Sequence, residues 1–293
     1  MKEFEHGGNV WQGGDPSEWI DFSANINPEG TPQEIKNQLL KAIDDITYYP
    51  DVAMTDTKER MAEFLSVSPS NILPTNGGIA ALDCIVASEK PTKTILFQPT
   101  FVEYERISRK YGIPTVLVPM INESDEITYD IHSAISHCTE GAMIFLCNPS
   151  NPIGTVLKKD RMIELLIRAE EKKAKVVVDE AFMDYCEEHT MRQYVESFDN
   201  LIVAGSFTKM FAIPGIRLGY LCSNQKNIQK YGDFLNPWSL SAFAVHTVKA
   251  LNEVENYQAN SVRLNNDRRE WLRKQLKSRG FFVFPSSQVR KSV

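Results

Sequence analysis

One lysine and one arginine lie eight positions apart in an apolar, turn-rich stretch, SFTKMFAIPGIRLGY, at residues 206–220. A lysine that is desolvated beside another cation loses its proton more readily, and its amine can then form a Schiff base with an aldehyde. An arginine beside a hydroxyl group can bind phosphate. Lys209 is therefore a candidate nucleophile, and Arg217 with Ser206 is a candidate phosphate site. A single lysine taken alone would more often be a solvated surface charge.

A second candidate phosphate site is a glycine pair that opens a predicted helix. The run ILPT at 72–75 predicts a strand, and Asn76-Gly77-Gly78 follows it directly. Free N–H groups at a helix N-terminus bind phosphate, and Gly77, Gly78 and Ile79 fit that role. Two adjacent glycines could also form only a tight turn.

An aromatic ring and a carboxylate follow two other predicted strands. Phe101 comes after the strand at 93–98 and could stack on a planar ring, or could be plain core. Asp179 lies with Glu180 near the end of the strand VVVDEA and could pair with a protonated heteroaromatic nitrogen, or could cap the next element. A planar ring that carries a phosphate, a basic nitrogen and an aldehyde is pyridoxal 5'-phosphate, an electron sink while its nitrogen is protonated.

The elements that would position these groups alternate along the chain. Short apolar runs predict strands, and apolar residues at i, i+3 and i+4 predict helices between them. The predicted strands are 93–98, 114–120, 142–147, 175–181 and 200–206, and the predicted helices are 79–89, 101–112, 127–138 and 160–173. This alternation predicts an α/β fold with a mostly parallel central sheet, covered on both faces. Ligands bind outside the carboxyl ends of such strands, so the polar residues should share one pocket.

The two ends of the chain predict a second, smaller domain. After Ser239 the pattern is helical as far as Gly280, and a strand-like run, FFVFP, follows at 281–285. A helix and one strand form an incomplete α+β unit. We therefore expect a large domain at 44–254 and a truncated small domain built from 1–43 and 255–293.

Composition excludes several classes of protein. The 293 residues carry a net charge of −6, which argues against nucleic acid or an anionic membrane as the main partner. Five cysteines without a CxxC pair predict reduced thiols in the cytoplasm, and the histidines lack metal-ligand spacing, so we predict no metal. No basic and apolar leader or span of ~18 apolar residues is seen, so we predict neither a signal peptide nor a membrane segment.

The order NGG, PTF, NPSNPIG, DEAF, SFTK and PGIRLGY resembles the fold-type-I, aspartate-aminotransferase-like family of pyridoxal phosphate enzymes. The resemblance covers nearly the whole chain and implies that family's three-layer fold. HGGN, DFSANINP, YYPD, DEAFMDY and NPWSLSAFA are similar to its histidinol-phosphate aminotransferase and threonine-phosphate decarboxylase branch, with the decarboxylases of cobalamin synthesis the better match.

The resemblance assigns a role to each residue around the cofactor ring. Lys209 would hold the cofactor as a Schiff base and later move protons. Asp179 would bind the ring nitrogen, and Asn151 the ring hydroxyl. Phe101 would cover one face of the ring and Ala181 the other.

The resemblance also assigns the phosphate end and the subunit contacts. Gly77, Gly78, Ser206 and Arg217 would hold the cofactor phosphate. Tyr49 would reach that phosphate from the second subunit of a homodimer with a shared active site.

The substrate would be a small amino acid or its phosphate ester, and His6 and Asn25 would line the substrate end. A terminal histidine such as His6 could instead be solvated. Aminotransferases of this branch usually have tyrosine at the position of Phe182, and phenylalanine there fits the decarboxylases better.

The best interpretation is L-threonine O-3-phosphate decarboxylation, and the alternative is transamination of the histidinol-phosphate type. Members of the family also have an arginine that clamps the substrate carboxylate or phosphate, and no segment of this chain matches it. A hypothesis of another class is therefore a truncated, catalytically impaired protein that still binds the cofactor.

Overall fold

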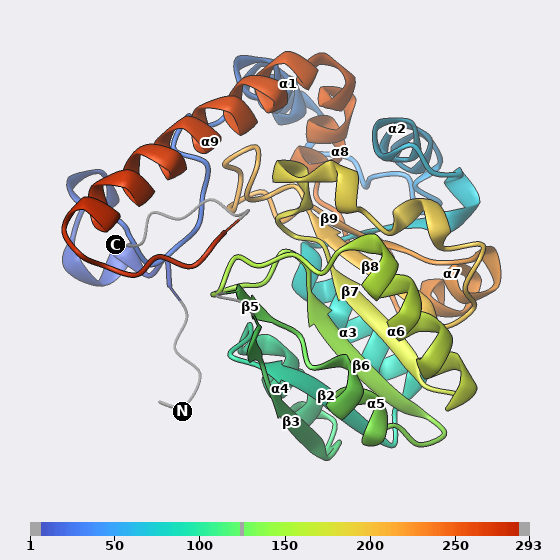
Figure 1. The fold of residues 1–293 in the computed structure, drawn as a ribbon. Coiled ribbons are helices and arrows are strands. Elements are labelled where there is room, and N and C mark those ends of the chain that lie inside the picture. The colour runs from blue at the N-terminus through green and yellow to red at the C-terminus, as the bar shows by residue number, and fades with distance from the viewer. Residues whose placement is uncertain (1–6, 124–125, 287–293) are drawn as a thin grey trace.

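The computed structural model describes residues 7–123 and 126–286 and is built around a seven-stranded sheet (Figure 1). Its strand order is β1-β9-β8-β7-β6-β2-β3. The bounds are β1 Ile72–Thr75, β2 Lys93–Gln98, β3 Thr115–Pro119, β6 Ala142–Cys147, β7 Lys175–Asp179, β8 Leu201–Ser206 and β9 Gly219–Cys222. A separate antiparallel hairpin pairs β4, Ile121–Glu123, with β5, Glu126–Thr128.

Most strands of this sheet run parallel, as the alternating pattern predicted. The pairs β2–β3, β2–β6, β6–β7 and β7–β8 are parallel, whereas β9 is antiparallel to both β8 and β1. In register, Cys147 lies opposite Asp179, and Gly219 lies opposite both Ser206 and Thr75. The ends of the central strands therefore meet at one edge of the sheet.

Two apolar cores lie on opposite faces of the sheet, because successive side chains of a strand point to opposite faces. Val176 and Val178 of β7 belong to one core, and Val177 belongs to the other. Helices α3 (Gly78–Glu89), α4 (Glu103–Lys110) and α7 (Gln225–Gly232) contribute to the Val177 core. Helices α2 (Thr55–Leu65), α5 (Ile131–Ser136), α6 (Lys159–Glu171) and α8 (Ala242–Lys249) contribute to the other. The three-layer α/β fold is thus confirmed.

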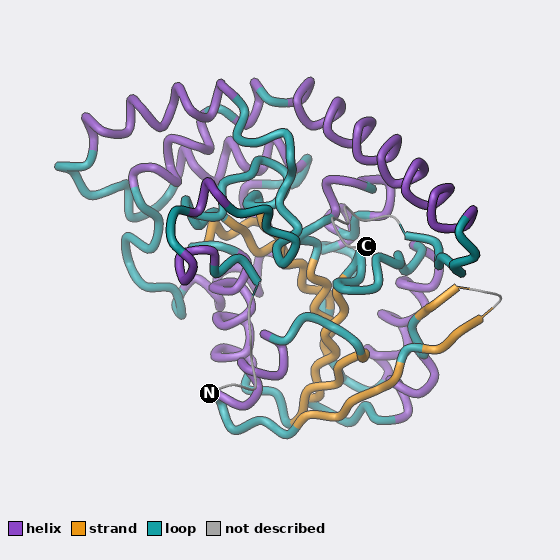
Figure 2. The backbone as a smooth tube through the Cα atoms, turned by 90° about the vertical axis from the view of Figure 1, so that its left-hand side faces the viewer, coloured by secondary structure: helices purple, strands orange, loops and turns teal. Residues whose placement is uncertain are grey.

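The first and the last long helices also pack against the Val176 core, the first through Ile35 and the last through Tyr257 and Val262. Helix α1 (Gln33–Asp45) packs against α8, and α9 (Glu255–Ser278) extends along the outside of the molecule (Figure 2). No helix in the described part of the chain is long and apolar enough to cross a membrane. The division at residues 44–254 stays a prediction.

Two predicted elements were wrong. The helix expected at 127–138 is β5 followed by α5, because Asp130 caps the helix by accepting a hydrogen bond from the Ser133 N–H. The strand expected at 281–285 has no regular structure, and Phe281 and Phe282 are exposed. A strand needs a hydrogen-bonded neighbour, and this run has none among the described residues. The helical region after Ser239 is divided into α8 and α9.

Candidate active site

Lys209 lies in the turn after β8 and is half-buried. Burial and the nearby Arg217 cation lower the pKa of its amine, while the carboxylates of Asp179 and Asp21 oppose that shift. Its Nζ lies 5.9 Å from the centre of the Phe182 ring. A lysine in these surroundings releases its proton at a lower pH than an exposed lysine.

Arg217 and the glycine turn before α3 come into contact. Gly77 has a φ of +79°, and a Cβ built on it would lie only 2.4 Å from Nη2 of Arg217. A Cβ at Gly219 would lie 2.6 Å from the backbone of both Gly77 and Gly78. Ser206 is the last residue of β8, and a Cβ at Gly78 would lie 3.6 Å from its Cβ. The structure thus gathers the residues predicted for the phosphate, and Ile79 is the second residue of α3.

Asp179 is the last residue of β7 and is buried. Its Oδ2 accepts a hydrogen bond of 2.8 Å from the Tyr104 hydroxyl, and its Oδ1 accepts one of 3.0 Å from the Ala181 N–H. Burial raises the pKa of Asp179, whereas these two bonds and the Lys209 charge oppose the rise. Tyr104 is not among the site residues predicted from the sequence. Its position three residues after Phe101, on a predicted helix, was the available signal.

The other ring-contact candidates lie around Asp179. Phe101 meets Tyr104 edge to face, with ring centres 5.7 Å apart. Asn151 is in the loop after β6, where its backbone lies close enough to the Cys147 thiol, opposite Asp179, to lower the pKa of that thiol against the effect of burial. Ala181 follows two residues after Asp179 and binds it through its N–H. Phe101, Asn151 and Ala181 are therefore near one strand edge.

The N-terminal segment lies directly against the lysine turn. The Asn27 N–H donates to the Lys209 carbonyl at 3.1 Å, and its Nδ2 donates to the Met210 carbonyl at 2.8 Å. Asn25 is two residues away and half-buried, whereas His6 lies outside the described residues. The residues before α1 thus reach the candidate site.

Tyr49 lies apart from the other predicted residues. It is 80% exposed, and its ring centre is 4.8 Å from that of Trp238. Within the described chain, no recorded contact joins Tyr49 to the glycine turn or to Arg217.

A buried ionic network beneath the site was also missed. Arg192 lies 3.4 Å from the Glu180 carboxylate, donates to the Tyr220 hydroxyl at 2.9 Å and pairs with Glu187 at 2.5 Å. Burial raises the pKa of Glu180 to about 7, although Arg192 opposes the rise. Glu180 follows Asp179 directly, so the network supports the strand end. Glu180 and Arg192 are 12 positions apart and Tyr220 is 28 positions beyond Arg192, so no helix or strand period joins them.

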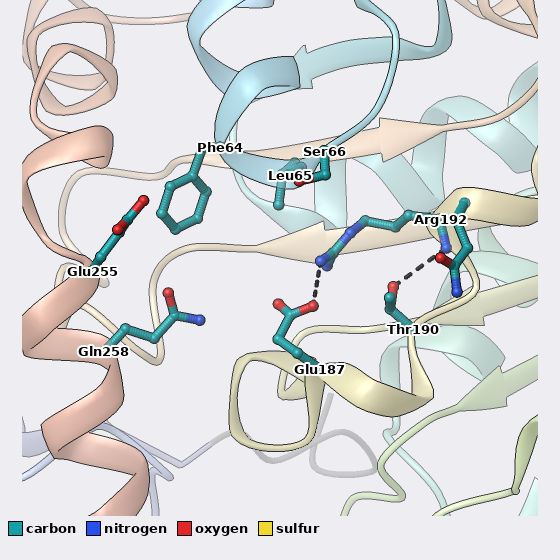
Figure 3. Close-up of a pocket in the computed structure, with 9 residues that line it drawn as sticks. Phe64, Leu65, Ser66, Glu187, Thr190, Arg192, Glu255 and Gln258 are labelled. Atoms are coloured by element: carbon teal, nitrogen blue, oxygen red, sulfur yellow. Dashed lines mark hydrogen bonds and ion pairs between the residues drawn. The ribbon is translucent and has the colours of Figure 1, made fainter.

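A cavity of about 270 Å³ lies next to this network (Figure 3), and Lys209 is not among the residues that line it. It is bounded by the end of α2, the segment that contains Glu187 and Arg192, and the first turns of α9. Among the described residues, no group of three or more His, Cys, Asp or Glu side chains could hold a metal ion.

The sequence matches known proteins over most of its length. The sequence model of the family "Aminotransferase class I and II" matches residues 17–289. A threonine-phosphate decarboxylase of Salmonella typhimurium is 31% identical over 248 residues, which is 82% of this chain and 67% of that protein. A histidinol-phosphate aminotransferase of Caldicellulosiruptor saccharolyticus is 28% identical, over 82% of this chain and 67% of that protein.

Solved structures have the same fold. The histidinol-phosphate aminotransferase of Clostridium acetobutylicum superposes with a TM-score of 0.82 and 28% identity, covering 92% of this chain and 81% of that one. The chain spans about two thirds of the length of curated relatives that it matches, with shares of 66% and 67% for two of them.

Proposed function

Because the chain belongs to the class I and II aminotransferase family, which depends on pyridoxal 5'-phosphate, we propose that it is an enzyme acting on an amino acid or its phosphate ester. Its best-supported reaction is the decarboxylation of L-threonine O-3-phosphate. The single observation that carries this choice is the Phe182 ring 5.9 Å from the Lys209 amine.

The residues of the site fit the cofactor. A Cβ at Gly77 would lie 2.4 Å from Nη2 of Arg217, so the absence of a side chain there lets the guanidinium approach this backbone closely. The Arg217 cation stands beside that turn, as a phosphate site requires. At the other end, the ionised form of buried Asp179 suits a protonated ring nitrogen.

We assign the residues as follows. Lys209 attaches the cofactor, Asp179 holds its ring nitrogen, and Asn151 binds its ring hydroxyl. Phe101 and Ala181 cover the two faces of the ring.

The phosphate is held by a second set: Gly77, Gly78, Ile79, Ser206, Arg217 and, from a second subunit, Tyr49. His6 and Asn25 line the substrate end.

When bound, the cofactor supplies an electron sink for the bond that breaks at the substrate Cα. Asp179 sustains that sink by keeping a proton on the ring nitrogen. Lys209 moves the proton at Cα, because burial and Arg217 favour its neutral amine. The proton enters at Cα after loss of the carboxylate in decarboxylation, and leaves Cα in transamination.

Phe182 supports decarboxylation. A tyrosine at this position would place a hydroxyl near the reacting centre, and phenylalanine gives only an apolar ring. The Salmonella decarboxylase is 31% identical to this chain and the Caldicellulosiruptor aminotransferase 28% identical. Transamination of the histidinol-phosphate type remains the second candidate, supported by the superposition on the Clostridium structure.

Product analysis tests the two reactions. Purified protein with pyridoxal phosphate is given L-threonine O-3-phosphate, and carbon dioxide is measured. It is then given histidinol phosphate with 2-oxoglutarate, and glutamate is measured. Carbon dioxide without glutamate supports the proposal, and glutamate alone supports transamination. If the protein binds the cofactor but forms neither product, it is the impaired protein of the third hypothesis.

A further inference from the structure

We propose that Tyr104 is a positioning residue that holds the Asp179 carboxylate in the orientation and charge that a protonated ring nitrogen requires. This role rests on the proposed function, because it concerns the contact between Asp179 and the cofactor. Tyr104 belongs to none of the sequence motifs described above, and its role is inferred from its contacts in the folded structure.

Tyr104 is fixed on every side. It is fully buried in α4, its ring stacks on Phe145 with centres 5.2 Å apart and planes 10° apart, and Phe101 meets it edge to face. Its hydroxyl donates to Oδ2 of Asp179 at 2.8 Å. Because the ring cannot turn without displacing Phe145, the hydroxyl occupies one position and fixes the carboxylate.

The hydroxyl also opposes the effect of burial. Burial raises the pKa of Asp179, and the Tyr104 hydrogen bond is the first of three interactions that lower it, followed by the Ala181 N–H and the Lys209 charge. The Cys147 thiol also faces this pair, and burial raises its pKa to about 12, so it stays neutral. Burial likewise raises the pKa of the Tyr104 phenol well above its ordinary value, so it remains a donor. Loss of the hydroxyl would therefore leave Asp179 more basic, and the proton would move from the ring nitrogen towards the carboxylate.

The same ring joins two predicted cofactor contacts. Phe101 is the predicted stacking residue and Asp179 the predicted nitrogen ligand, and Tyr104 touches both. Tyr104 thus fixes the spacing between Phe101, which would stack on the cofactor ring, and Asp179, which would bind the nitrogen of that ring.

The test compares two isosteric variants. Tyr104→Phe removes the hydroxyl that reaches Asp179. Tyr129→Phe removes an equally buried hydroxyl that donates to the Cys147 carbonyl at 2.5 Å and leaves Asp179 untouched. Binding of pyridoxal phosphate is measured by its visible absorbance between pH 5 and 9, and folding by circular dichroism.

Tyr104→Phe should weaken cofactor binding by about 10-fold to 100-fold, the range for a hydrogen bond to a charged group. It should also move the acid limb of binding to higher pH by about one unit, because the pKa of Asp179 rises. Tyr129→Phe should change binding by less than about threefold and leave the acid limb in place.

A double-mutant cycle separates positioning from packing. In an Asp179→Asn background, Tyr104→Phe should change binding by less than about twofold, because the charge it serves is gone. An equal loss in both backgrounds would overturn the proposal, as would wild-type affinity and pH dependence in Tyr104→Phe. If wild-type protein itself does not bind pyridoxal phosphate, it is the proposed function that fails.

Discussion

The Arg217 guanidinium fills the space into which a side chain at Gly77 would project, since a Cβ there would lie 2.4 Å from Nη2. Two segments 140 positions apart thus depend on each other for one binding surface. This contact explains why a glycine and an arginine that share no local pattern act together.

Gly77→Ala should therefore impair cofactor binding. The new methyl group must displace Arg217, and a φ of +79° disfavours any side chain, so we expect at least a tenfold loss of affinity and about 1–2 kcal/mol of stability. Absorbance titration and urea unfolding measure the two effects. Gly232→Ala is the control, because a Cβ at Gly232 in α7 meets nothing within 4 Å. Equal affinities in both variants would contradict the assignment of Gly77.

The attachment of the cofactor should depend on the protonation of Lys209. Because burial and Arg217 lower the pKa of its amine, the rate of attachment to apo-protein should rise with pH and reach its plateau below the ordinary lysine pKa. Stopped-flow absorbance measures this rate.

Removing the Arg217 cation should shift the pH dependence of the attachment rate to higher pH. In Arg217→Gln, Asp179 and Asp21 still favour the charged amine, so the midpoint should move to higher pH. Lys209→Ala should give no borohydride-reducible adduct at any pH. An unshifted profile in Arg217→Gln would show that Arg217 does not act on the amine.

The buried carboxylates beneath the site should make stability fall as pH rises. Burial, Glu187 and Glu180 raise the pKa of Asp184 to about 8, and Arg192 opposes them. The folded protein therefore holds a proton that the unfolded chain loses near pH 4, and this stabilisation disappears between about pH 4 and pH 8.

Asp184→Asn should accordingly be more stable than wild type by about 1–3 kcal/mol at pH 9 and similar to it at pH 4. Urea unfolding at both pH values measures this difference. Asp267→Asn, which alters an exposed carboxylate in α9, should show no such pH dependence. A constant difference across the pH range would argue against a raised pKa.

Breaking the buried ion pair between Arg192 and Glu180 should lower the free energy of unfolding. Arg192→Met leaves the Glu180 carboxylate without its cation at a site where the two side chains are 6% and 0% exposed. We expect a loss of about 3–5 kcal/mol at pH 8, measured by urea unfolding. The loss should shrink towards pH 5, where Glu180 is protonated, because its pKa is about 7. A loss that does not vary with pH would reflect packing alone.

Tyr49 should contact the cofactor phosphate in the other subunit of a homodimer. It is exposed beside Trp238 and apart from the glycine turn, so its predicted phosphate contact requires a second copy of the chain. Mixing the inactive variants Tyr49→Ala and Lys209→Ala should restore about a quarter of wild-type activity, because half of the dimers then contain one intact site. Light scattering should report a dimer, and a monomer would contradict this prediction.

Much of the fold followed from local pattern. The strand at 175–181 and the helix at 160–173 have periods that permit one main interpretation, and β7 and α6 lie there. The run FFVFP failed because its apolar residues satisfy a strand pattern, while strand formation depends on a neighbour that the pattern does not contain.

The sequence by itself determined the chemistry of the site. A lysine, an arginine, a glycine pair and a carboxylate at strand ends indicated one cofactor, since residue type and order along the chain are enough to define such groups. The tertiary structure alone decided how their properties are set. The contacts of Asp179 with Tyr104 and of Gly77 with Arg217 join segments distant in sequence, and the fold also buries Glu180 against Arg192, 12 positions later. Burial and charge act through space, so only the folded chain sets the direction in which the pKa values of Asp179, Glu180 and Lys209 shift.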